Sequence, residues 1–318
     1  MSQLVSNVAV VAKPLARQPY SFRKDVQRRL WRSPSARVGM FLVVLIVGLA
    51  VIVPLVDRYD AVRDKNPRAR YQAPDCVIGW LRGDFTEEAI TCQYPMGSDK
   101  NGRSIMQRVG QGLSVSLVAG VFSVTISLVG GTIIGLTAGY LSGWVDSLFM
   151  RFMDIILAFP SLLLAIALVA VAGRSLTNGM IAVAITAIPV YARLARSMAI
   201  SIRNTEYVMA ARSTGASDFK IIVSHVLPNS LAPLIVQTTL GLGTAVVETA
   251  ALGFLGLGQQ PPFPELGKML ADSQESLLSG KWWVMVFPGF TIILMVLGFN
   301  LLGDGLRDAL DPRLRGSD

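Results

Sequence analysis

The sequence has little of what a soluble enzyme needs. Only 16% of its 318 residues are charged, and His225 is its one histidine, whereas soluble domains carry roughly 25% charged residues. One histidine excludes a zinc site with paired imidazoles. The sequence also contains no Gly-x-x-x-x-Gly-Lys-Ser/Thr loop, no Gly-x-Ser-x-Gly elbow, no His-Glu-x-x-His and no Gly-x-Gly-x-x-Gly turn. We therefore expect no enzyme activity, no metal site, no bound cofactor and no ATP hydrolysis by this chain alone.

The residues that are abundant are apolar. Hydrophobic residues make up 52% of the chain, and the mean hydropathy is +0.51. A helix must run for about 20 residues to cross the hydrocarbon core of a bilayer. Six segments suit such a crossing: 38–56, 113–140, 155–173, 175–192, one beginning near Leu231, and 282–303. The sequence predicts an all-α integral membrane protein with six transmembrane helices, of which Pro160 and Pro189 can kink the third and fourth.

Two apolar stretches are difficult to interpret as single crossings. The run from Val109 to Val145 has 37 uncharged residues. As one helix it would extend about 55 Å, which is longer than a crossing, so we expect a shorter helix from Leu113 to Tyr140. The stretch 249–264 contains three glycines and three prolines, which disfavour a continuous helix. We expect a short helix or a re-entrant hairpin there.

The distribution of lysine and arginine predicts the orientation. With six spans both termini lie on one side, and cytoplasmic segments carry an excess of Lys and Arg. Residues 1–37, the turn at Arg151, 193–230 and 304–318 contain 17 Lys/Arg and 9 Asp/Glu, whereas the opposite segments contain 12 and 11. We therefore expect cytoplasmic termini and an extracytoplasmic loop at 57–108. This orientation also accounts for the net charge of +8, so no nucleic-acid partner is expected.

The N-terminal segment contains a short amphipathic pattern. Phe22, Val26 and Leu30 recur every four residues among five basic residues. This pattern is typical of a helix that lies on the membrane surface and contacts lipid, and Pro34 would end it before the first span. A solvated tail is the alternative.

Both cysteines, Cys76 and Cys92, lie in the 57–108 loop, which the charge distribution places outside. External compartments permit disulfides, and closing a loop of this size stabilises a fold by roughly 3 kcal/mol. We expect a bond between the two cysteines. Two free thiols in an irregular loop are the alternative.

The longest cytoplasmic loop within the bundle, 193–230, has the pattern of short helices joined at a glycine. A polar residue at 204 or 205 can cap the first helix, and Gly215 can end it in a left-handed conformation. Ser217 can cap a second helix, which Pro228 is expected to stop. Such a small, stiff unit either fills a groove of another protein or covers its own bundle.

At this loop the sequence resembles the integral-membrane permease subunits of ABC importers. Their loop carries Glu-Ala-Ala, three residues, Gly, nine residues and Ile-x-Leu-Pro. Met209 stands here in place of the glutamate and His225 in place of the isoleucine, departures that resemble the peptide and nickel branch of the family. The resemblance assigns ATPase coupling to Met209, Ala210, Ala211, Arg212, Gly215, Ala216, Ser217, His225, Leu227 and Pro228.

Three further stretches, 97–103, 250–258 and 300–313, resemble the C-type subunit of dipeptide and oligopeptide permeases. The resemblance implies a type I ABC importer permease-like bundle with its core at 109–303, in the bacterial cytoplasmic (inner) membrane. It also implies a homologous second permease subunit, two ABC ATPase subunits that hold ATP and magnesium, and an extracytoplasmic peptide-binding protein.

The function that follows from the resemblance is translocation of dipeptides or oligopeptides, driven through loop 193–230. Nickel or another small solute is the alternative cargo, for which one histidine and two cysteines make a poor metal path. An ion-coupled secondary transporter and a membrane anchor without a conduit are alternatives of other classes. Repeated halves and several intramembrane ionisable residues would favour the secondary transporter.

Few ionisable residues occur near the spans. Glu248 is the only acid in the apolar stretch that contains the fifth crossing, and a charge near the bilayer centre is costly. We expect it either to line the outer mouth of a pathway, where it could meet a peptide amine, or to pair with a loop cation. Arg151 and Asp154 are spaced for an i,i+3 pair, and Arg307 and Asp311 for an i,i+4 pair.

Overall fold

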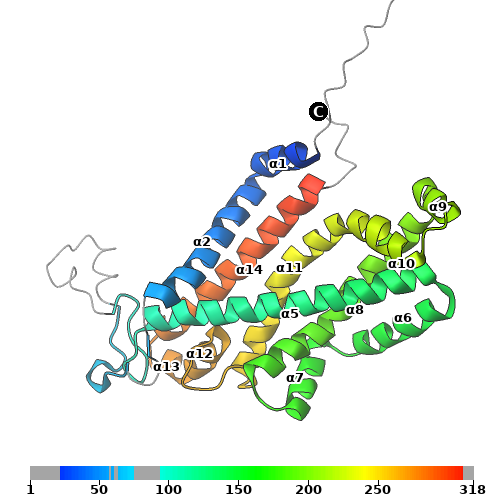
Figure 1. The fold of residues 1–318 in the computed structure, drawn as a ribbon. Helices are drawn as coiled ribbons and strands as arrows, with labels where there is room; N and C mark the ends of the chain where they lie inside the picture. The colour runs from blue at the N-terminus through cyan, green and yellow to red at the C-terminus, as the bar shows by residue number, and fades with distance from the viewer. Residues whose placement is uncertain (1–21, 57–58, 61–63, 75–93, 311–318) are drawn as a thin grey trace, which may run out of the picture.

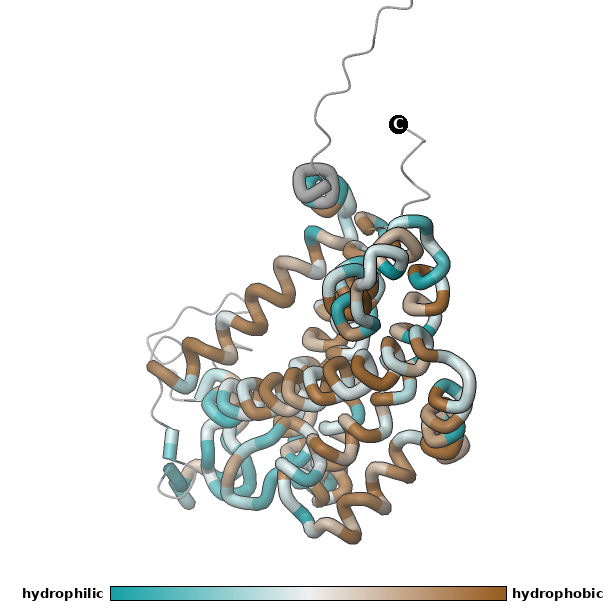
Figure 2. Tube along the Cα trace, turned by 45° about the vertical axis from the view of Figure 1, so that its right-hand side comes forward, coloured by the Kyte–Doolittle hydropathy of each residue, from teal (hydrophilic) through white to brown (hydrophobic). Residues whose placement is uncertain are grey.

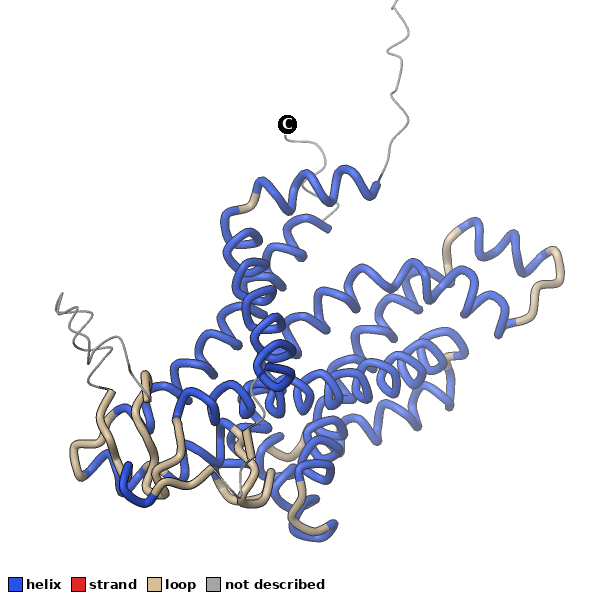
Figure 3. The backbone as a smooth tube through the Cα atoms, turned by 60° about the vertical axis from the view of Figure 1, so that its left-hand side comes forward, coloured by secondary structure: helices blue, strands red, loops and turns tan. Residues whose placement is uncertain are grey.

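The computed structural model describes residues 22–56, 59–60, 64–74 and 94–310, and these form helices joined by loops (Figure 3). The five long helices are α2 (Pro34–Val56), α5 (Ile105–Leu141), α8 (Leu176–Arg203), α11 (Leu227–Phe254) and α14 (Trp283–Leu310). The shorter ones are α1 (Phe22–Arg32), α6 (Gly143–Leu157), α7 (Ser161–Ala172), α9 (Glu206–Ser213), α10 (Asp218–Ile221), α12 (Leu266–Asp272) and α13 (Gln274–Leu278). The predicted disulfide partners, Cys76 and Cys92, lie outside the described residues.

Among the described residues, five helical segments are long and apolar enough to cross a membrane, with 218–254 counted as one of them. α6 and α7 form a sixth unit when taken together, although they meet at an angle of 91°. Figure 2 shows apolar residues along the long helices and polar residues in the loops at their ends. The prediction of an all-α membrane bundle is confirmed, and the described helices give five candidate crossings, or six if this bent pair counts as one.

The third predicted span, 155–173, is not a single helix. α6 ends at Leu157 and α7 begins at Ser161, and between them Pro160 has a ψ of 129°. Proline has no N–H to donate and disfavours helical geometry in the residue before it. The prediction of one kinked helix was therefore wrong, because the proline breaks the helix into two.

The second predicted span is too short. α5 is one continuous helix of 37 residues, capped by the hydroxyl of Ser104, which accepts a hydrogen bond from the backbone N–H of Gln107. The helix contains the predicted span 113–140 and begins eight residues before it, because the polar first turns, which include Arg108, are helical too. These turns need not lie in the hydrocarbon layer, so a long helix here does not require a long crossing.

α5 and α8 pack so closely that three glycine positions of α5 leave no space for a side chain. A Cβ atom at Gly131, Gly135 or Gly139 would lie 2.7, 2.2 or 2.6 Å from a backbone carbonyl oxygen of α8. Two hydroxyl groups of α5 also bond across the seam: Ser123 donates to the Met180 carbonyl and Ser127 to the Ala184 carbonyl, both at 2.9 Å. Small residues every four positions and serine hydrogen bonds are the usual means of joining helices in membranes.

The fifth span starts earlier than predicted. α10 continues through a π-helical turn, Ile222–Val226, directly into α11. Pro228 therefore does not stop the helix that Ser217 caps, and α11 begins at Leu227 rather than near Leu231. The wide turn accounts for this, because a π-bulge leaves room for a proline that lacks the N–H of a regular helical turn.

Two smaller predictions can be compared with the structure. The N-terminal amphipathic segment is helical as α1, and Pro34 is the first residue of α2, where a missing N–H costs little. The stretch 249–264 is helical at its start, because α11 continues to Phe254. The rest of the stretch is irregular, and the next short helix, α12, begins only at Leu266, beyond the stretch in which a short helix or re-entrant hairpin was expected.

The helices define two ends of the bundle. α2 runs antiparallel to α5, because Ser114 near the start of α5 donates a hydrogen bond to the carbonyl of Ala50 near the end of α2. α1 packs against α14, and Figure 1 shows α9 and α10 at the C-terminal end of α5. We call this the inner end. The loop 94–104, α12 and α13 gather at the opposite, outer end (Figure 1).

Candidate functional site

The loop that the sequence singled out forms a compact unit at the inner end, which we call the coupling segment (206–228). α9 is followed by Gly215, whose φ of +84° ends the helix as predicted. The hydroxyl of Ser217 accepts a hydrogen bond from the Lys220 N–H and caps α10, also as predicted. Thr205 occupies the N-cap position of α9, but its hydroxyl donates to the Ile202 carbonyl instead.

The coupling segment has a buried base and an exposed face. Val208 is 1% exposed, and Ala211, Ala216 and Leu227 pack partly buried against the same core cluster. The remaining predicted residues of α9 and the turn are exposed: Met209, Ala210, Arg212, Gly215 and Ser217. A buried anchor beneath an exposed surface is the arrangement that lets a segment contact another protein without losing its place in its own bundle.

Two exposed aromatic residues on this face were not predicted. Phe219 is 77% exposed and Tyr207 is 46% exposed. Aromatic residues in the centre of a surface patch are typical of protein interfaces. A phenylalanine in an otherwise polar loop was the signal in the sequence that would have found the first of them.

His225 and Pro228 lie at the junction with α11. The His225 ring packs against the Tyr207 ring with centroids 6.1 Å apart, and the Asn229 side chain donates to the His225 carbonyl at 2.7 Å. Pro228 is exposed in the first turn of α11. These contacts give the histidine a packing role between α9 and the start of the fifth span.

Tyr140, which the sequence did not single out, links the coupling segment to α5. Its hydroxyl donates to Oδ1 of Asp218 at 3.0 Å and accepts from Nη2 of Arg212 at 2.8 Å. The Arg212 guanidinium also lies over the Tyr140 ring, 5.4 Å from its centroid. Because Tyr140 is only 4% exposed, the two helices of the coupling segment are joined to a fixed point at the C-terminus of α5.

Arg203 ties the same point to α8. Its Nη1 donates to the carbonyls of Gly139 and Tyr140 at 3.0 and 3.4 Å, and also to the hydroxyl of Ser142. A cation at the C-terminus of a helix satisfies carbonyls that have no partner within the helix. The ends of α5 and α8 and the coupling segment therefore form one polar network.

The acids of α6 pair with α8 rather than with their own helix. Asp146 accepts two hydrogen bonds from Arg196, at 2.5 and 2.6 Å, and Asp154 accepts one from Arg193 at 2.6 Å. The predicted pair of Arg151 with Asp154 was wrong, because α6 lies along α8 and its acids reach the arginines there. The other predicted pair requires Asp311, which lies outside the described residues.

Glu248 lines a cavity of about 280 Å³ between α5, α8, α11 and the bend between α6 and α7. Its Oε1 accepts a hydrogen bond from the Ser161 hydroxyl at 2.7 Å. Gln237, Gly241, Thr244 and Glu248 follow one another at intervals of four, three and four residues and all line the cavity, so they lie on one face of α11. The structure thus places Glu248 inside the bundle, with a hydroxyl as its partner.

Glu265 is a buried acid that the sequence did not reveal. It is 2% exposed, and its carboxylate accepts hydrogen bonds from the N–H groups of Gly267 and Lys268 at the start of α12. Burial raises the pKa of Glu265 to about 7, against the lowering effect of these hydrogen bonds and of the Lys268 charge. A Cβ at Gly253 would lie 1.9 Å from its Oε2, so the glycine-rich stretch makes room for the carboxylate.

Metal binding has no ready ligand set in this part of the chain. Within 22–56, 59–60, 64–74 and 94–310, no group of three or more His, Cys, Asp or Glu residues is arranged to hold an ion. The polar groups of the inner end are engaged with each other, and those of the cavity are hydroxyls, an amide and one carboxylate. Such a set suits hydrogen bonding to an organic molecule.

Two family descriptions match the sequence. Residues 131–316 match the inner membrane component of binding-protein-dependent transport systems. Residues 21–74 match the N-terminal transmembrane domain of oligopeptide transport permease C.

Curated relatives are similar over most of the chain. The dipeptide transport system permease protein DppC of Alkalihalophilus pseudofirmus is 46% identical over 292 residues, which cover 92% of this chain and 90% of that protein. The di/tripeptide transport system permease protein DppC of Pseudomonas aeruginosa is 42% identical, with coverage of 91% and 93%. The glutathione transport system permease protein GsiD of Shigella boydii is 40% identical, with coverage of 99% and 97%.

A solved structure has the same fold. An inward-facing form of the MetNI methionine ABC transporter contains a chain that superposes with a TM-score of 0.54 at 19% identity. The match covers 65% of this chain and 98% of that chain. At this identity the similarity concerns the fold alone.

Proposed function

The chain belongs to the family of inner membrane components of binding-protein-dependent transport systems, and from this premise we propose that it is the membrane-spanning permease subunit of an ATP-driven importer of dipeptides or oligopeptides. The observation that carries this function is the 46% identity to a dipeptide permease over 92% of the chain. The fold is that of a type I ABC importer permease. Nickel is not favoured as cargo, because the relatives described above are named for peptides and for glutathione, itself a tripeptide.

The coupling segment is the proposed contact with an ATPase subunit. Its exposed face presents Met209, Tyr207 and Phe219, and its base is held by Val208. Apolar and aromatic side chains of this kind fill grooves on partner proteins. Two ABC ATPase subunits with their ATP and magnesium, a homologous second permease and an extracytoplasmic peptide-binding protein complete the proposed importer, and this chain supplies no ATPase site.

Movement of the ATPase subunits would reach the spans through the polar network at the inner end. Arg212 and Asp218 move with the coupling segment, and both bond to Tyr140 at the end of α5. Because the π-helical turn continues into α11 without a break, the same motion also turns the helix that carries Glu248. The bundle would thereby switch between inward-open and outward-open arrangements.

Glu248 is the proposed contact for the peptide on its way through the bundle. It is the single carboxylate among the residues that line the 280 Å³ cavity. A carboxylate with only a hydroxyl as partner favours a cation beside it, and the N-terminal ammonium of a peptide supplies one. Placed with its inner end in the cytoplasm, as the Lys and Arg distribution favours, the protein would lie in the bacterial inner membrane with both termini inside.

Reconstitution of the complex in vesicles tests this function. The importer is assembled from the chain, the second permease, the two ATPases and the binding protein, and uptake of a labelled dipeptide is measured with ATP. Ala211→Arg, which places a bulky charge at the base of the coupling segment, is expected to abolish peptide-stimulated ATP hydrolysis, because it displaces the segment. Glu248→Gln is expected to lower uptake by about tenfold while ATP hydrolysis persists, because one charged contact of about 1.4 kcal/mol is lost.

Three results would contradict the proposal. Uptake by the chain alone, without ATPase subunits, would make it a secondary transporter. Normal assembly and stimulated hydrolysis in Ala211→Arg would remove the coupling role from this segment. Unchanged uptake in Glu248→Gln would remove the peptide contact from the cavity.

A further inference from the structure

Two arginines are buried at the outer end, just before and within the first turn of α5. Arg103 is 7% exposed and Arg108 is 6% exposed. A guanidinium group is always charged in a protein, and buried charges are normally paired with an opposite charge. Each of these arginines therefore needs an anion.

Arg108 has its anion within this chain. Its Nε lies 3.6 Å from Oδ2 of Asp99, and its Nη1 donates to the Tyr59 hydroxyl at 3.2 Å. The other oxygen of Asp99 accepts from the backbone N–H groups of Asn101 and Arg103, at 2.8 and 2.9 Å. Asp99 is thus fully engaged by one guanidinium and two amides.

Arg103 has no such partner. Its Nε is buried without a hydrogen-bond acceptor, and its guanidinium forms no ion pair with any residue that the structure describes. Of the other acids at this end, Asp272 is paired with Lys268 at 3.1 Å, and the buried Glu265 accepts hydrogen bonds from the N–H groups of Gly267 and Lys268. The Arg103 guanidinium is therefore left without an anion among the residues that the structure describes.

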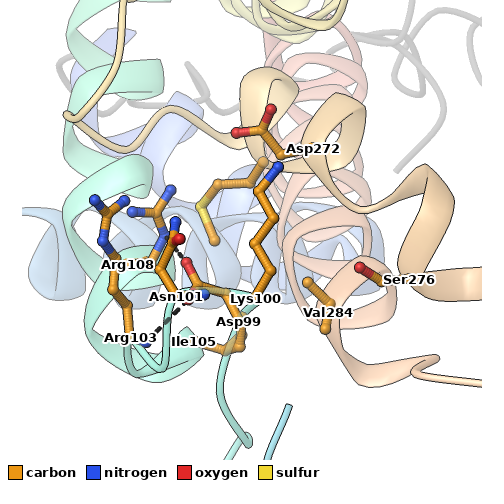
Figure 4. A pocket seen from close by; sticks show the side chains of 10 residues that line it. Asp99, Lys100, Asn101, Arg103, Ile105, Arg108, Asp272, Ser276 and Val284 are labelled. Atoms are coloured by element: carbon orange, nitrogen blue, oxygen red, sulfur yellow. Dashed lines mark hydrogen bonds and ion pairs between the residues drawn. The ribbon is translucent and has the colours of Figure 1, made fainter. Parts of the chain in front are cut away.

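A small cavity opens beside this charge. Its volume is about 30 Å³, and Figure 4 shows Arg103, Asn101 and Arg108 on one side of it, with Ser276 and Val284 on the other. The cavity beside Glu248 is about nine times larger. The smaller space therefore suits a single group, such as a carboxylate that enters from outside.

We propose that Arg103 is the receptor for a carboxylate carried by an acidic side chain of the extracytoplasmic binding protein. This inference rests on the proposed function, which supplies that partner. Arginine suits the role because its planar fork bonds a carboxylate with two parallel hydrogen bonds. The pocket lies at the outer end, among the loop 94–104, α12 and α14, where such a protein docks.

The location also separates this carboxylate from that of a peptide held at Glu248. Ser123, the outermost α5 residue in the Glu248 cavity, is 15 residues beyond Arg108, the innermost α5 residue of the Arg103 pocket. This separation corresponds to about 22 Å along the helix, whereas an extended dipeptide spans about 7 Å. A dipeptide held at Glu248 does not also reach Arg103, so for a cargo of this length the anion comes from another molecule.

The test measures how the binding protein stimulates ATP hydrolysis by the assembled complex in lipid nanodiscs. Binding protein is titrated in at low and high NaCl, and each rate is divided by the basal rate of the same complex. Arg103→Gln is expected to raise the half-maximal concentration of binding protein at least tenfold and to reduce its dependence on salt. Arg103→Lys is expected to raise it several-fold, because the charge remains and the fork is lost. Arg70→Gln, which removes an exposed cation from the same outer region, is the matched control and is expected to change it less than twofold.

The outcomes separate this inference from the function on which it rests. If the binding protein does not stimulate the unmodified complex, the proposed function itself fails. If stimulation is normal and Arg103→Gln has the same half-maximal concentration of binding protein as Arg70→Gln, the assignment of Arg103 as a carboxylate receptor is wrong. If the Arg103→Gln complex does not assemble, Arg103→Lys is measured instead, and an unchanged half-maximal concentration would also contradict the assignment. Glycylglycine and glycylglycine amide serve as competitors. Inhibition by the free acid alone would assign the pocket to a peptide terminus and overturn the binding-protein assignment.

Discussion

The two ends of α5 are built in opposite ways. At the inner end, the Tyr140 hydroxyl, Arg212, Asp218 and Arg203 bond to one another and to the last carbonyls of the helix. At the outer end, Arg103 is buried, and its guanidinium has no partner among the described residues. One helix of 37 residues therefore joins a closed polar network to an incomplete one.

This difference indicates different tasks for the two ends. A closed network holds its parts in fixed relation and passes on movement, as the proposed contact with an ATPase subunit requires. An incomplete network is completed only when another molecule arrives. The close packing of α5 against α8 keeps α5 rigid, and only a rigid helix transmits displacement from one of its ends to the other.

The largest effect is expected from disrupting the close packing of α5 against α8. Gly135→Leu places a side chain where a Cβ would already lie 2.2 Å from the Ala192 carbonyl oxygen. Overpacking against backbone costs about 3 kcal/mol or more, so we expect loss of most folded, monodisperse protein in size-exclusion chromatography. Gly48→Leu in α2, where a Cβ meets nothing within 4 Å, is the control. Equal yields of folded protein from the two variants would contradict a structural role for the close packing of α5 against α8.

A second effect concerns the outer end alone and depends on pH. Burial raises the pKa of Glu265 from 4.5 to about 7, so between these values the folded state holds a proton that the unfolded state releases. The contribution of Glu265 to the stability of the folded state is therefore complete below about pH 4.5. It is lost as the pH rises toward 8, by about 3 kcal/mol in all. Glu265→Gln is expected to abolish this fall.

Melting temperatures in detergent at pH 5, 6, 7 and 8 measure the dependence. Glu275→Gln, which neutralises an exposed acid of α13, serves as the control and is expected to leave the decline in place. A melting temperature of the unmodified protein that rises from pH 5 to pH 8 would contradict the assignment to Glu265.

The smallest effect is expected from removing one hydroxyl group from the polar network at the inner end. Tyr140→Phe removes the hydroxyl that bonds Arg212 and Asp218 but keeps the buried ring. Hydrogen bonds to charged groups contribute about 1.5 kcal/mol at the lower end of their range, so we expect about tenfold fewer peptides imported per ATP hydrolysed. The folded yield should not change.

Transport and hydrolysis measured on the same vesicles give this ratio. Thr125→Val removes a hydroxyl of α5 that bonds only within its own helix and should leave the ratio unchanged. Asp218→Asn combined with Tyr140→Phe should add little to either variant alone, because both act through one contact. Additive losses would show that the two residues act separately.

Hydropathy predicted most of the bundle, because a bilayer imposes a length and a composition that are visible along the chain. The local features of the coupling segment were also predictable: a positive φ at Gly215 and a cap at Ser217 depend on neighbours in sequence. Prolines were harder to interpret. Pro160 breaks a helix, whereas Pro228 sits in one that a π-helical turn has widened, and the sequence does not distinguish the two settings.

Contacts between distant segments were not predictable. Tyr140 meets Arg212 across 72 residues of sequence, and no spacing rule for a single helix brings them together. Glu265 left a weak signal, an acid close to glycines that make room for its carboxylate. Arg103 lay within a stretch that marked the family, but its lack of a partner is visible only when the surrounding groups are placed in space.

The right-angled join between α6 and α7 has a geometric consequence for the Glu248 cavity. Leu157 and Ser161, on either side of the join, both line that cavity. α7 has 12 residues and is therefore about 18 Å long, so changing the angle by about ten degrees would displace its far end by about 3 Å, close to the width of a water molecule. Because Leu157 and Ser161 lie at the join itself, such a tilt would move the far end of α7 while the residues that line the cavity stayed almost in place.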